Sequence, residues 1–394
     1  MSGLVPSGAQ TYSKTRYPSC APPYAISATG PWVTCSDGRT YVDAVAALGP
    51  IMLGHRWPSV EDAVLTQARK GVSFSLPTEL EEQLASKLVS LVPRMEMARF
   101  GKNGVDVVNA AVRIARAATG HSTVWMEEGA YHGHSDWALT APKDGGIVPM
   151  AGFRTRRFPR GDLQALREGM RDEARGPACV LLDPQPAHNP SPPKPGYFRE
   201  IRSLCDEQGA LLILDEMVTG FRLGWPGGVS TFGIDCDMWC GAKALGNGWP
   251  ITCLLGKREY MTRIEQDVFY STTFAGEAVS IAAAIACLDE MEKLAATNAV
   301  NETGAAIRDW YNETVKVFEL SGLTRTIGYD SRPVFVWKDK SHEAAFTEGV
   351  VRGGMLFQGY INVMVAHERA WPEITGALTS GLEAVQAALP LPAA

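Results

Sequence analysis

The 394-residue chain has the composition of an ordinary globular protein and a formal net charge of −6. This length allows two or three domains of about 150 residues each, with a core large enough to be stable without a metal or a disulfide. The charge is spread without long runs of one sign, which argues against a general affinity for nucleic acid. The eight cysteines form no C-x-x-C pair, so we interpret them as buried, reduced thiols and expect no metal site.

The sequence indicates neither a targeting segment nor a membrane span. Its first residues, MSGLVPSGAQTYSK, lack the apolar core of a signal peptide. Its most apolar run, AVSIAAAIACL, is shorter than the roughly 20 residues that a bilayer requires. We therefore expect a cytoplasmic protein with no membrane partner.

The predicted elements begin with a hairpin and continue as alternating strands and helices. Residues 31–48 (PWVTCSDGRTYVDAVAAL) predict a hairpin with an Asp-Gly turn. Further along, apolar strands over 178–183 and 210–216 flank a helix that Gly209 ends. Because strands that are apolar at every position are covered on both faces, this pattern predicts an α/β fold with a parallel sheet.

The C-terminal part of the sequence predicts a second, smaller α/β domain. From Ala278 to about Leu320 the pattern is helical. A strand (PVFVWKD, 333–339), a helix, a short strand (INVMVAH, 361–367) and a closing helix follow.

Asp215 ends the apolar strand over 210–216. In an open parallel sheet, ligands bind outside the carboxyl ends of the strands. This acid could therefore hold a magnesium ion beside a nucleotide, or it could face a protonated ring nitrogen. The magnesium hypothesis needs a G-x-x-x-x-G-K-[ST] loop, which neither FGKNG nor LLGKRE supplies. An acid that only caps the next turn is equally compatible with the local pattern.

A turn at Asn103-Gly104 precedes a helical pattern, VDVVNAAVRIARAATG. The N–H groups and the positive dipole end of such a helix start suit a phosphate. Because most helices begin at turns of this kind, the pattern indicates a phosphate site only in combination with other signals.

The segment EEGAYHGHSDW contains Tyr131, His132, His134 and Asp136. Alternating histidines in a loop are weak evidence for a metal, and we expect none here. Tyr131 can instead present its aromatic face to a flat ligand.

Lys243 lies among small residues in the stretch WCGAKALGNGWP. A lysine nucleophile needs a depressed pKa, and small neighbours let a bulky ligand approach its amine. Taken alone, such a lysine is also compatible with a structural role. Together with the helix start, the aromatic face and the strand-end acid, it matches the phosphate, flat ring, pyridine nitrogen and aldehyde of pyridoxal phosphate.

The motifs LLILDEMVTGFRLG and AKALGNGWPI, with YHGHSDW upstream and YSTTFAGE downstream, resemble the class III (fold-type I) pyridoxal-phosphate-dependent aminotransferase family. Within it, the chain is most similar to glutamate semialdehyde aminomutase-like enzymes, over nearly its whole length. The resemblance implies an α/β fold in which helices cover a mostly parallel sheet, with a smaller α/β domain built from both termini. The expected boundaries are 1–60 for the N-terminal segment, which covers the active site, 61–285 for the large cofactor-binding domain and 286–394 for the small C-terminal domain.

The resemblance also implies roles for individual residues. Lys243 would hold the cofactor as an internal aldimine, and Asp215 would keep the pyridine nitrogen protonated. The backbone around Asn103, Gly104 and Val105 would bind the phosphate.

Further implied contacts lie on both faces of the ring. Tyr131 would stack on one face and Met217 would pack on the other, while His132 would support the Tyr131 loop. Thr273 would reach the phosphate bound by the neighbouring subunit, which implies a homodimer with shared active sites.

The chain departs from the family's pattern at several positions. Val105 lacks the hydroxyl that the phosphate loop usually provides. Asp183 stands where a glutamate is common, and His188 or Asn189 lies near the place where an asparagine contacts the ring hydroxyl. These departures leave the type of reaction open.

We expect amino-group transfer, by an aminotransferase or an aminomutase, on a small amine or amino acid. The alternative is a decarboxylase of the same fold, including one that acts on an amino acid linked to a nucleobase, as in phages that modify thymine. A nucleic acid would then be only the carrier of the substrate. A third hypothesis is a binding or structural protein that has lost the chemistry, against which the retention of Lys243 and Asp215 argues.

Overall fold

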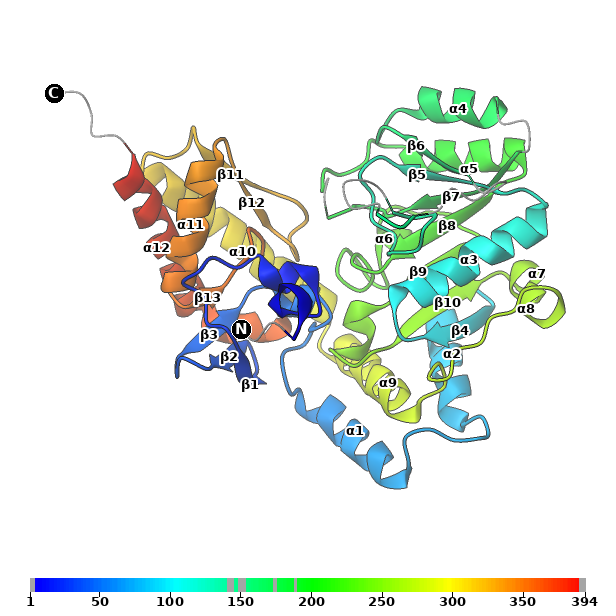
Figure 1. Ribbon diagram of the computed structural model, residues 1–394, viewed down its shortest axis with the longest axis horizontal. Coiled ribbons are helices and arrows are strands. Elements are labelled where there is room, and N and C mark those ends of the chain that lie inside the picture. The colour runs from blue at the N-terminus through cyan, green and yellow to red at the C-terminus, as the bar shows by residue number, and fades with distance from the viewer. Residues whose placement is uncertain (1–3, 140–144, 148–153, 173–175, 188–189, 390–394) are drawn as a thin grey trace. The chain divides into compact units, whose positions relative to one another are not determined.

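A computed structural model describes residues 4–139, 145–147, 154–172, 176–187 and 190–389. The chain forms two compact units, one made of residues 59–289 and the other of residues 1–58 and 290–394 (Figure 1). None of the helices in these described ranges combines the length and the apolar character that crossing a membrane requires.

The larger unit is built on a seven-stranded sheet with the order β4-β10-β9-β8-β7-β5-β6. Strand β10 runs antiparallel to both of its neighbours, and the remaining neighbours pair in parallel. This arrangement confirms the mostly parallel α/β sheet that the sequence predicts. In chain order the strands are β4 (Met97–Gly101), β5 (Thr123–Glu127), β6 (Thr155–Phe158), β7 (Pro177–Leu182), β8 (Leu211–Glu216), β9 (Met238–Gly241) and β10 (Thr252–Gly256).

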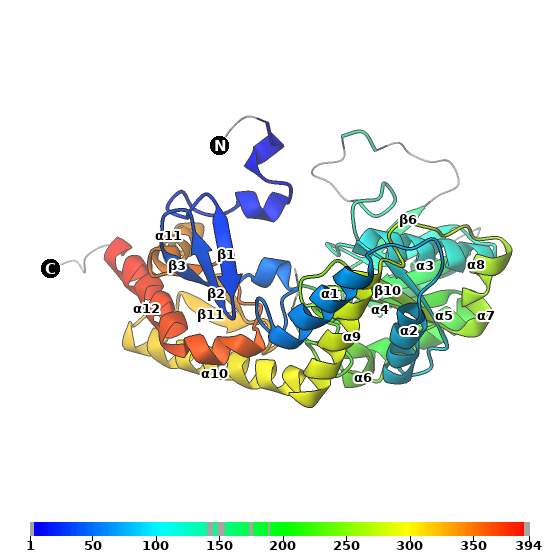
Figure 2. The ribbon, with the colours of Figure 1, turned by 90° about the horizontal axis from the view of Figure 1, so that it is seen from below.

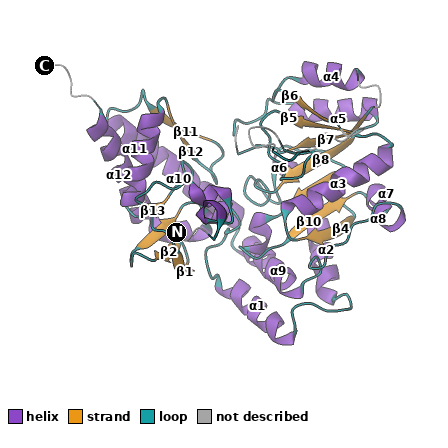
Figure 3. Cartoon of the chain, viewed as in Figure 1, coloured by secondary structure: helices purple, strands orange, loops and turns teal. Residues whose placement is uncertain are grey.

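The central strands are buried at every position because helices cover the sheet (Figure 3). The helix α3 (Gly104–Thr119) packs its valine, alanine and isoleucine side chains on alternate strand residues such as Leu181, Ile213 and Cys240. Each fully buried side chain of this size contributes about 1.5–3 kcal/mol. The residues between them in sequence point to the opposite face, so both faces are apolar.

The other helices of the larger unit lie before, between and after these strands in the chain. The helix α5 (Tyr197–Gln208) ends at Gly209, whose φ of +65° provides the left-handed C-cap that the sequence predicts. The remaining helices are α1 (Pro58–Lys70), α2 (Glu79–Leu91), α4 (Leu163–Arg171), α6 (Gly228–Thr231), α7 (Arg258–Met261), α8 (Arg263–Gln266) and α9 (Ala278–Lys293), whose last four residues belong to the smaller unit.

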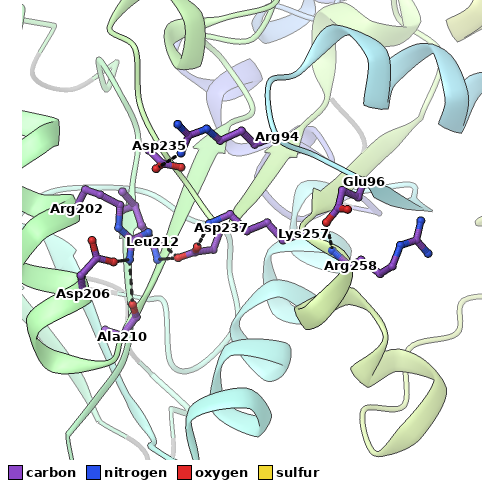
Figure 4. Close-up of polar contacts among 10 residues, drawn as sticks. All are labelled: Arg94, Glu96, Arg202, Asp206, Ala210, Leu212, Asp235, Asp237, Lys257 and Arg258. Atoms are coloured by element: carbon purple, nitrogen blue, oxygen red, sulfur yellow. Dashed lines mark hydrogen bonds and ion pairs between the residues drawn. The ribbon is translucent and has the colours of Figure 1, made fainter.

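Charged side chains surround the amino end of β9 (Figure 4). Asp237, immediately before this strand, accepts hydrogen bonds from Arg202 Nη1 at 2.7 Å, Lys257 Nζ at 2.6 Å and Leu212 N at 2.8 Å. Burial alone would raise the pKa of Asp237, but the hydrogen bonds from Lys257 and Arg202 together outweigh burial and lower it. The network holds α5, β8 and β9 together at the end of the sheet opposite Lys243.

The smaller unit combines the two ends of the chain in one sheet. Strands β1 (Ala25–Thr29), β2 (Trp32–Cys35) and β3 (Thr40–Asp43) are antiparallel, and β13 (Met355–Leu356) pairs in parallel with β3. The β2–β3 pair is the hairpin that the sequence predicts. A second pair, β11 (Thr324–Ile327) and β12 (Val334–Trp337), accompanies the helices α10 (Ala296–Val317), α11 (Lys340–Arg352) and α12 (Trp371–Ala388), and α12 lies alongside α10 in Figure 2.

Two features of this region differ from the sequence prediction. The stretch 361–367 is not a strand, because its N–H groups bond to carbonyls of several separate segments, among them Pro333, Ala44 and Met52, instead of one neighbouring strand. The helical pattern after Ala278 is also interrupted, since Ala295 adopts a left-handed φ of +46° between α9 and α10.

Candidate functional site

A cavity of about 380 Å³ lies at the carboxyl ends of the strands in the larger unit. This volume falls in the range of small-molecule and cofactor sites. Eight of the nine residues predicted for the site line it; the ninth, Thr273, is exposed and is not among the lining residues. The lining consists of Asn103, Gly104, Val105, Val108, Gly129, Tyr131, His132, Gly133, His134, Asp183, Pro186, Ala187, Asp215, Met217, Val218, Ala242 and Lys243.

The N-terminus of α3 forms one wall of the cavity. Asp106 fixes this helix start, because its carboxylate accepts hydrogen bonds from the N–H groups of Lys102 and Asn103, both at 2.9 Å. Gly104 and Val105 occupy the first turn, whose N–H groups have no acceptor inside the helix. A Cβ at position 104 would lie 3.0 Å from Met217 Sδ, so glycine lets Met217 pack closely against the start of this helix.

Asp215 is buried at the end of β8, with 4% of its surface exposed. Its Oδ2 lies 2.7 Å from Nδ1 of the buried His132, and its Oδ1 accepts a hydrogen bond from Met217 N at 3.0 Å. The other ring nitrogen of His132, Nε2, is buried and has no hydrogen-bond partner within the described ranges. The carboxylate is thus oriented by a histidine and by the backbone while it lines the cavity.

Lys243 follows β9, the strand next to β8. It adopts a left-handed conformation with a φ of +48°, which costs about 1 kcal/mol or more for a residue with a side chain. Strained backbone of this kind concentrates at functional sites. The turn brings the lysine to the same cavity as Asp215.

Tyr131 lies on the loop after β5, and 74% of its surface is exposed, so its ring is open to a ligand. The loop is held by α3, because Asn109 donates to Ser135 Oγ at 2.9 Å and accepts from Trp137 Nε1 at 2.8 Å. His134 lines the cavity, but no three metal-ligating side chains gather anywhere in the ranges that the structure describes.

A polar triad of Glu127, Arg160 and Tyr197 is not predicted from the sequence. Arg160 Nη1 lies 2.5 Å from Glu127 Oε2, and Arg160 Nη2 donates to the carbonyl of Pro184 at 2.9 Å. Tyr197 donates its hydroxyl to Glu127 Oε1 at 2.6 Å. Burial, together with the charge of Glu127, raises the pKa of Tyr197, so the hydroxyl keeps its proton.

The triad positions the two loops that carry Tyr131 and Asp183. Glu127 is the last residue of β5, directly before the Tyr131 loop, and Pro184 directly follows Asp183. The signal in the sequence was an acid at the end of an apolar strand, TVWME, the same signal that singled out Asp215.

The cavity fits pyridoxal phosphate. The first turn of α3 offers backbone N–H groups to a phosphate, and Gly104 and Val105 of this turn line the cavity. Asp215 offers an oriented carboxylate to a ring nitrogen, and Lys243 offers an amine to an aldehyde.

Comparison with known proteins identifies the same class of protein. The aminotransferase class-III family matches residues 19–320. The FumI protein of Sphingopyxis sp. MTA144, described in its pyridoxal-phosphate-bound form, is 28% identical with a TM-score of 0.87, over 98% of this chain and 93% of that chain.

Two further structures share the fold at lower identity. An omega-transaminase from Sphaerobacter thermophilus is 23% identical with a TM-score of 0.87, over 97% of this chain and 94% of that chain. A glutamate-1-semialdehyde-aminomutase from Pseudomonas aeruginosa PAO1 is 22% identical with a TM-score of 0.84, over 96% and 91% of the two chains.

Proposed function

This chain belongs to the class III aminotransferase family, and from that premise we propose that it is an enzyme that transfers the amino group of a small amine or amino acid. Its cofactor is pyridoxal 5′-phosphate. The observation that carries the proposal is the convergence of Lys243, Asp215 and the N-terminus of α3 on one cavity. The FumI protein, at 28% identity, supports it as a relative described with the same cofactor.

Each side chain of the site has its own role. When bound, the cofactor supplies an electron sink for the carbon next to the substrate's amino group. The amine of Lys243 would hold the cofactor through its aldehyde. Once a substrate amine had replaced it, this amine would take the proton from the substrate carbon and deliver it to the cofactor's aldehyde carbon. The carboxylate of Asp215 holds a proton on the ring nitrogen, which keeps the electron sink effective. Tyr131 and Met217 would contact the two faces of the ring, and His132 orients Asp215.

Incubation with a panel of amines and amino acids, followed by mass spectrometry, tests this function. A keto product with the cofactor left in its amine form identifies an aminotransferase, and an isomer of the substrate identifies an aminomutase. Release of carbon dioxide would instead identify a decarboxylase, for which the panel includes amino acids linked to nucleosides. If the purified protein bound no added cofactor, the proposal would be wrong and a binding or structural protein would be indicated.

We also propose that two copies of the chain form a homodimer with shared active sites. Two segments of the larger unit, residues 65–76 and 269–274, expose apolar side chains that a partner would cover. Ala278 N, shortly after the second segment, donates a hydrogen bond to Val72 O in the first. These side chains are Leu65, Val72, Phe74, Leu76, Phe269 and Phe274. Thr273 lies within the second segment and would reach the phosphate held by the other copy.

Mixed dimers test the shared site. We expect Thr273→Ala to weaken cofactor binding by about 10-fold, since one hydrogen bond to a charged group is lost, whereas Thr272→Ala serves as a neighbouring control. Mixing the Lys243→Ala and Thr273→Ala chains would restore one site with normal affinity per dimer. A monomer by light scattering, or no restoration in the mixture, would contradict the proposal.

A further inference from the structure

A second carboxyl group lines the cavity beside Asp215. Asp183 directly follows β7, and because Leu182 of β7 is opposite Leu214 of β8, Asp183 comes opposite Asp215. Neighbouring residues at the same level of adjacent parallel strands point to the same face. Both carboxyl groups line the cavity together with Lys243, so three consecutive strands, β7, β8 and β9, each contribute one ionisable group.

The two carboxyl groups have different surroundings. Asp215 lies against His132 Nδ1 and accepts from Met217 N. Asp183 accepts one hydrogen bond, from Gln185 N at 3.0 Å, and the described ranges provide no ion-pair partner within 4 Å of it. Its environment therefore favours the form that carries a proton.

The two acids of β8 shift the pKa of Asp183 in the same direction as burial does. Burial raises the pKa of Asp183 well above its ordinary range, and the negative charges of Asp215 and Glu216 raise it further. The hydrogen bond from Gln185 N and the positive charge of Lys243 lower the pKa, but they do not outweigh burial. Asp183, which has no ion-pair partner within the described ranges, thus keeps its proton to a higher pH than an ordinary aspartate does.

The topology indicates which part of the cofactor Asp183 would meet. In pyridoxal phosphate the aldehyde carbon is flanked on one side by the phosphate arm and on the other by the ring hydroxyl. The N-terminus of α3 would bind the phosphate arm. This helix begins near β10, since Thr252 Oγ1 lies 3.4 Å from Asn103 O. With the aldehyde at Lys243, which follows β9, the hydroxyl side faces away from β10 and toward β7.

We propose that Asp183 remains a neutral carboxylic acid in the loaded enzyme and donates a hydrogen bond to the hydroxyl oxygen of the cofactor ring. The inference rests on the proposed function. This donor stabilises the ionised ring oxygen. The oxygen then attracts the proton on the Lys243 nitrogen less strongly. Asp183 thereby sets the pH at which that nitrogen loses its proton. Arg160 fixes the donor in place through its hydrogen bond to the adjacent carbonyl of Pro184.

The pH titration of the visible absorbance of the Lys243-bound cofactor tests this inference without an activity measurement. In Asp183→Asn the side-chain amide still donates and carries no charge, so the midpoint stays within about half a pH unit of wild type. In Asp183→Ala the donor is lost, and the midpoint rises by about one unit, the equivalent of one hydrogen bond to a charged group. Asp235→Asn, at a half-buried position at the other end of the sheet, is the matched control and leaves the midpoint unchanged.

Other outcomes overturn the proposal. If Asp183 carried a negative charge, both substitutions would remove it and lower the midpoint. If neither substitution moved the midpoint, the donor to the ring oxygen would be another residue; His188 and Asn189, which lie outside the described residues, would be the next to substitute. If wild-type protein showed no cofactor absorbance at all, the proposed function itself would fail, and this inference with it.

Discussion

Charged side chains have different surroundings at the two ends of strand β9. At its amino end, Asp237 is surrounded by Arg202, Lys257 and a backbone N–H group at 2.6–2.8 Å (Figure 4). Beyond its carboxyl end, Lys243 and Asp215 line a cavity of about 380 Å³. The first arrangement pairs its charges within the protein, and the second directs polar groups toward a space that a ligand can fill.

Within one sheet, the charged residues at one end therefore contribute to stability, and those at the other end form the binding site. Buried charges that are paired and hydrogen-bonded contribute to holding elements together, and removal of one partner leaves an uncompensated charge. Polar groups aimed into a cavity, such as the buried His132 beside Asp215, are typical of a binding site. Substitutions at the two ends should therefore change different measurements.

The largest effect is expected from Lys243→Ala. One side chain both holds the cofactor and moves the proton, so we expect turnover to fall by roughly 10⁴-fold or more and the visible absorbance of the bound cofactor to disappear. Lys257→Ala, at the opposite end of β9, is the matched control and should retain the absorbance. Absorbance that survived in Lys243→Ala would show that another amine holds the cofactor.

A large loss of stability is expected from Asp237→Asn. This change leaves Arg202 and Lys257 without their buried counter-charge, and we expect the free energy of unfolding to fall by about 3 kcal/mol. Asp235→Asn, which breaks only an exposed pair with Arg94, should cost less than about 1 kcal/mol. Equal urea midpoints for the two variants would contradict this difference.

A selective loss of rate is expected from Asp215→Asn. The amide cannot hold a proton on the ring nitrogen, so turnover should fall by about 10²-fold or more while cofactor affinity changes little. Equilibrium dialysis of the cofactor and single-turnover rates measure the two quantities separately. An undiminished rate would rule out the role proposed for Asp215.

The smallest effect concerns acid stability. Because the pKa of Asp237 is lowered in the folded protein, its contribution is present above the ordinary aspartate pKa of about 3.9 and is lost as the pH falls through the lowered value. The difference in unfolding free energy between wild type and Asp237→Asn should therefore be largest near pH 7 and should shrink below about pH 4. Urea titrations at several pH values measure it, and a difference that grew on acidification would be inconsistent with the lowered pKa.

Local patterns in the sequence predicted the elements that depend on local chemistry. The apolar strands β7 and β8, the glycine that ends α5 and the hairpin of β2 and β3 all appear in the structure. The stretch 361–367 was predicted incorrectly, because its apolar alternation resembles a strand while its hydrogen-bond partners belong to several distant segments. Only the folded chain supplies those partners.

The sequence by itself determined the family of this protein and eight of the side chains that line its cavity, since motif order and residue type carry that information. The tertiary structure alone decided which of these groups are adjacent and which are buried. It brought Glu127, Arg160 and Tyr197 into one triad over 70 residues of sequence and placed Asp183 beside Asp215. The physical reason is that proton affinity and hydrogen bonding depend on burial and on neighbours from other strands, which no local stretch of sequence contains.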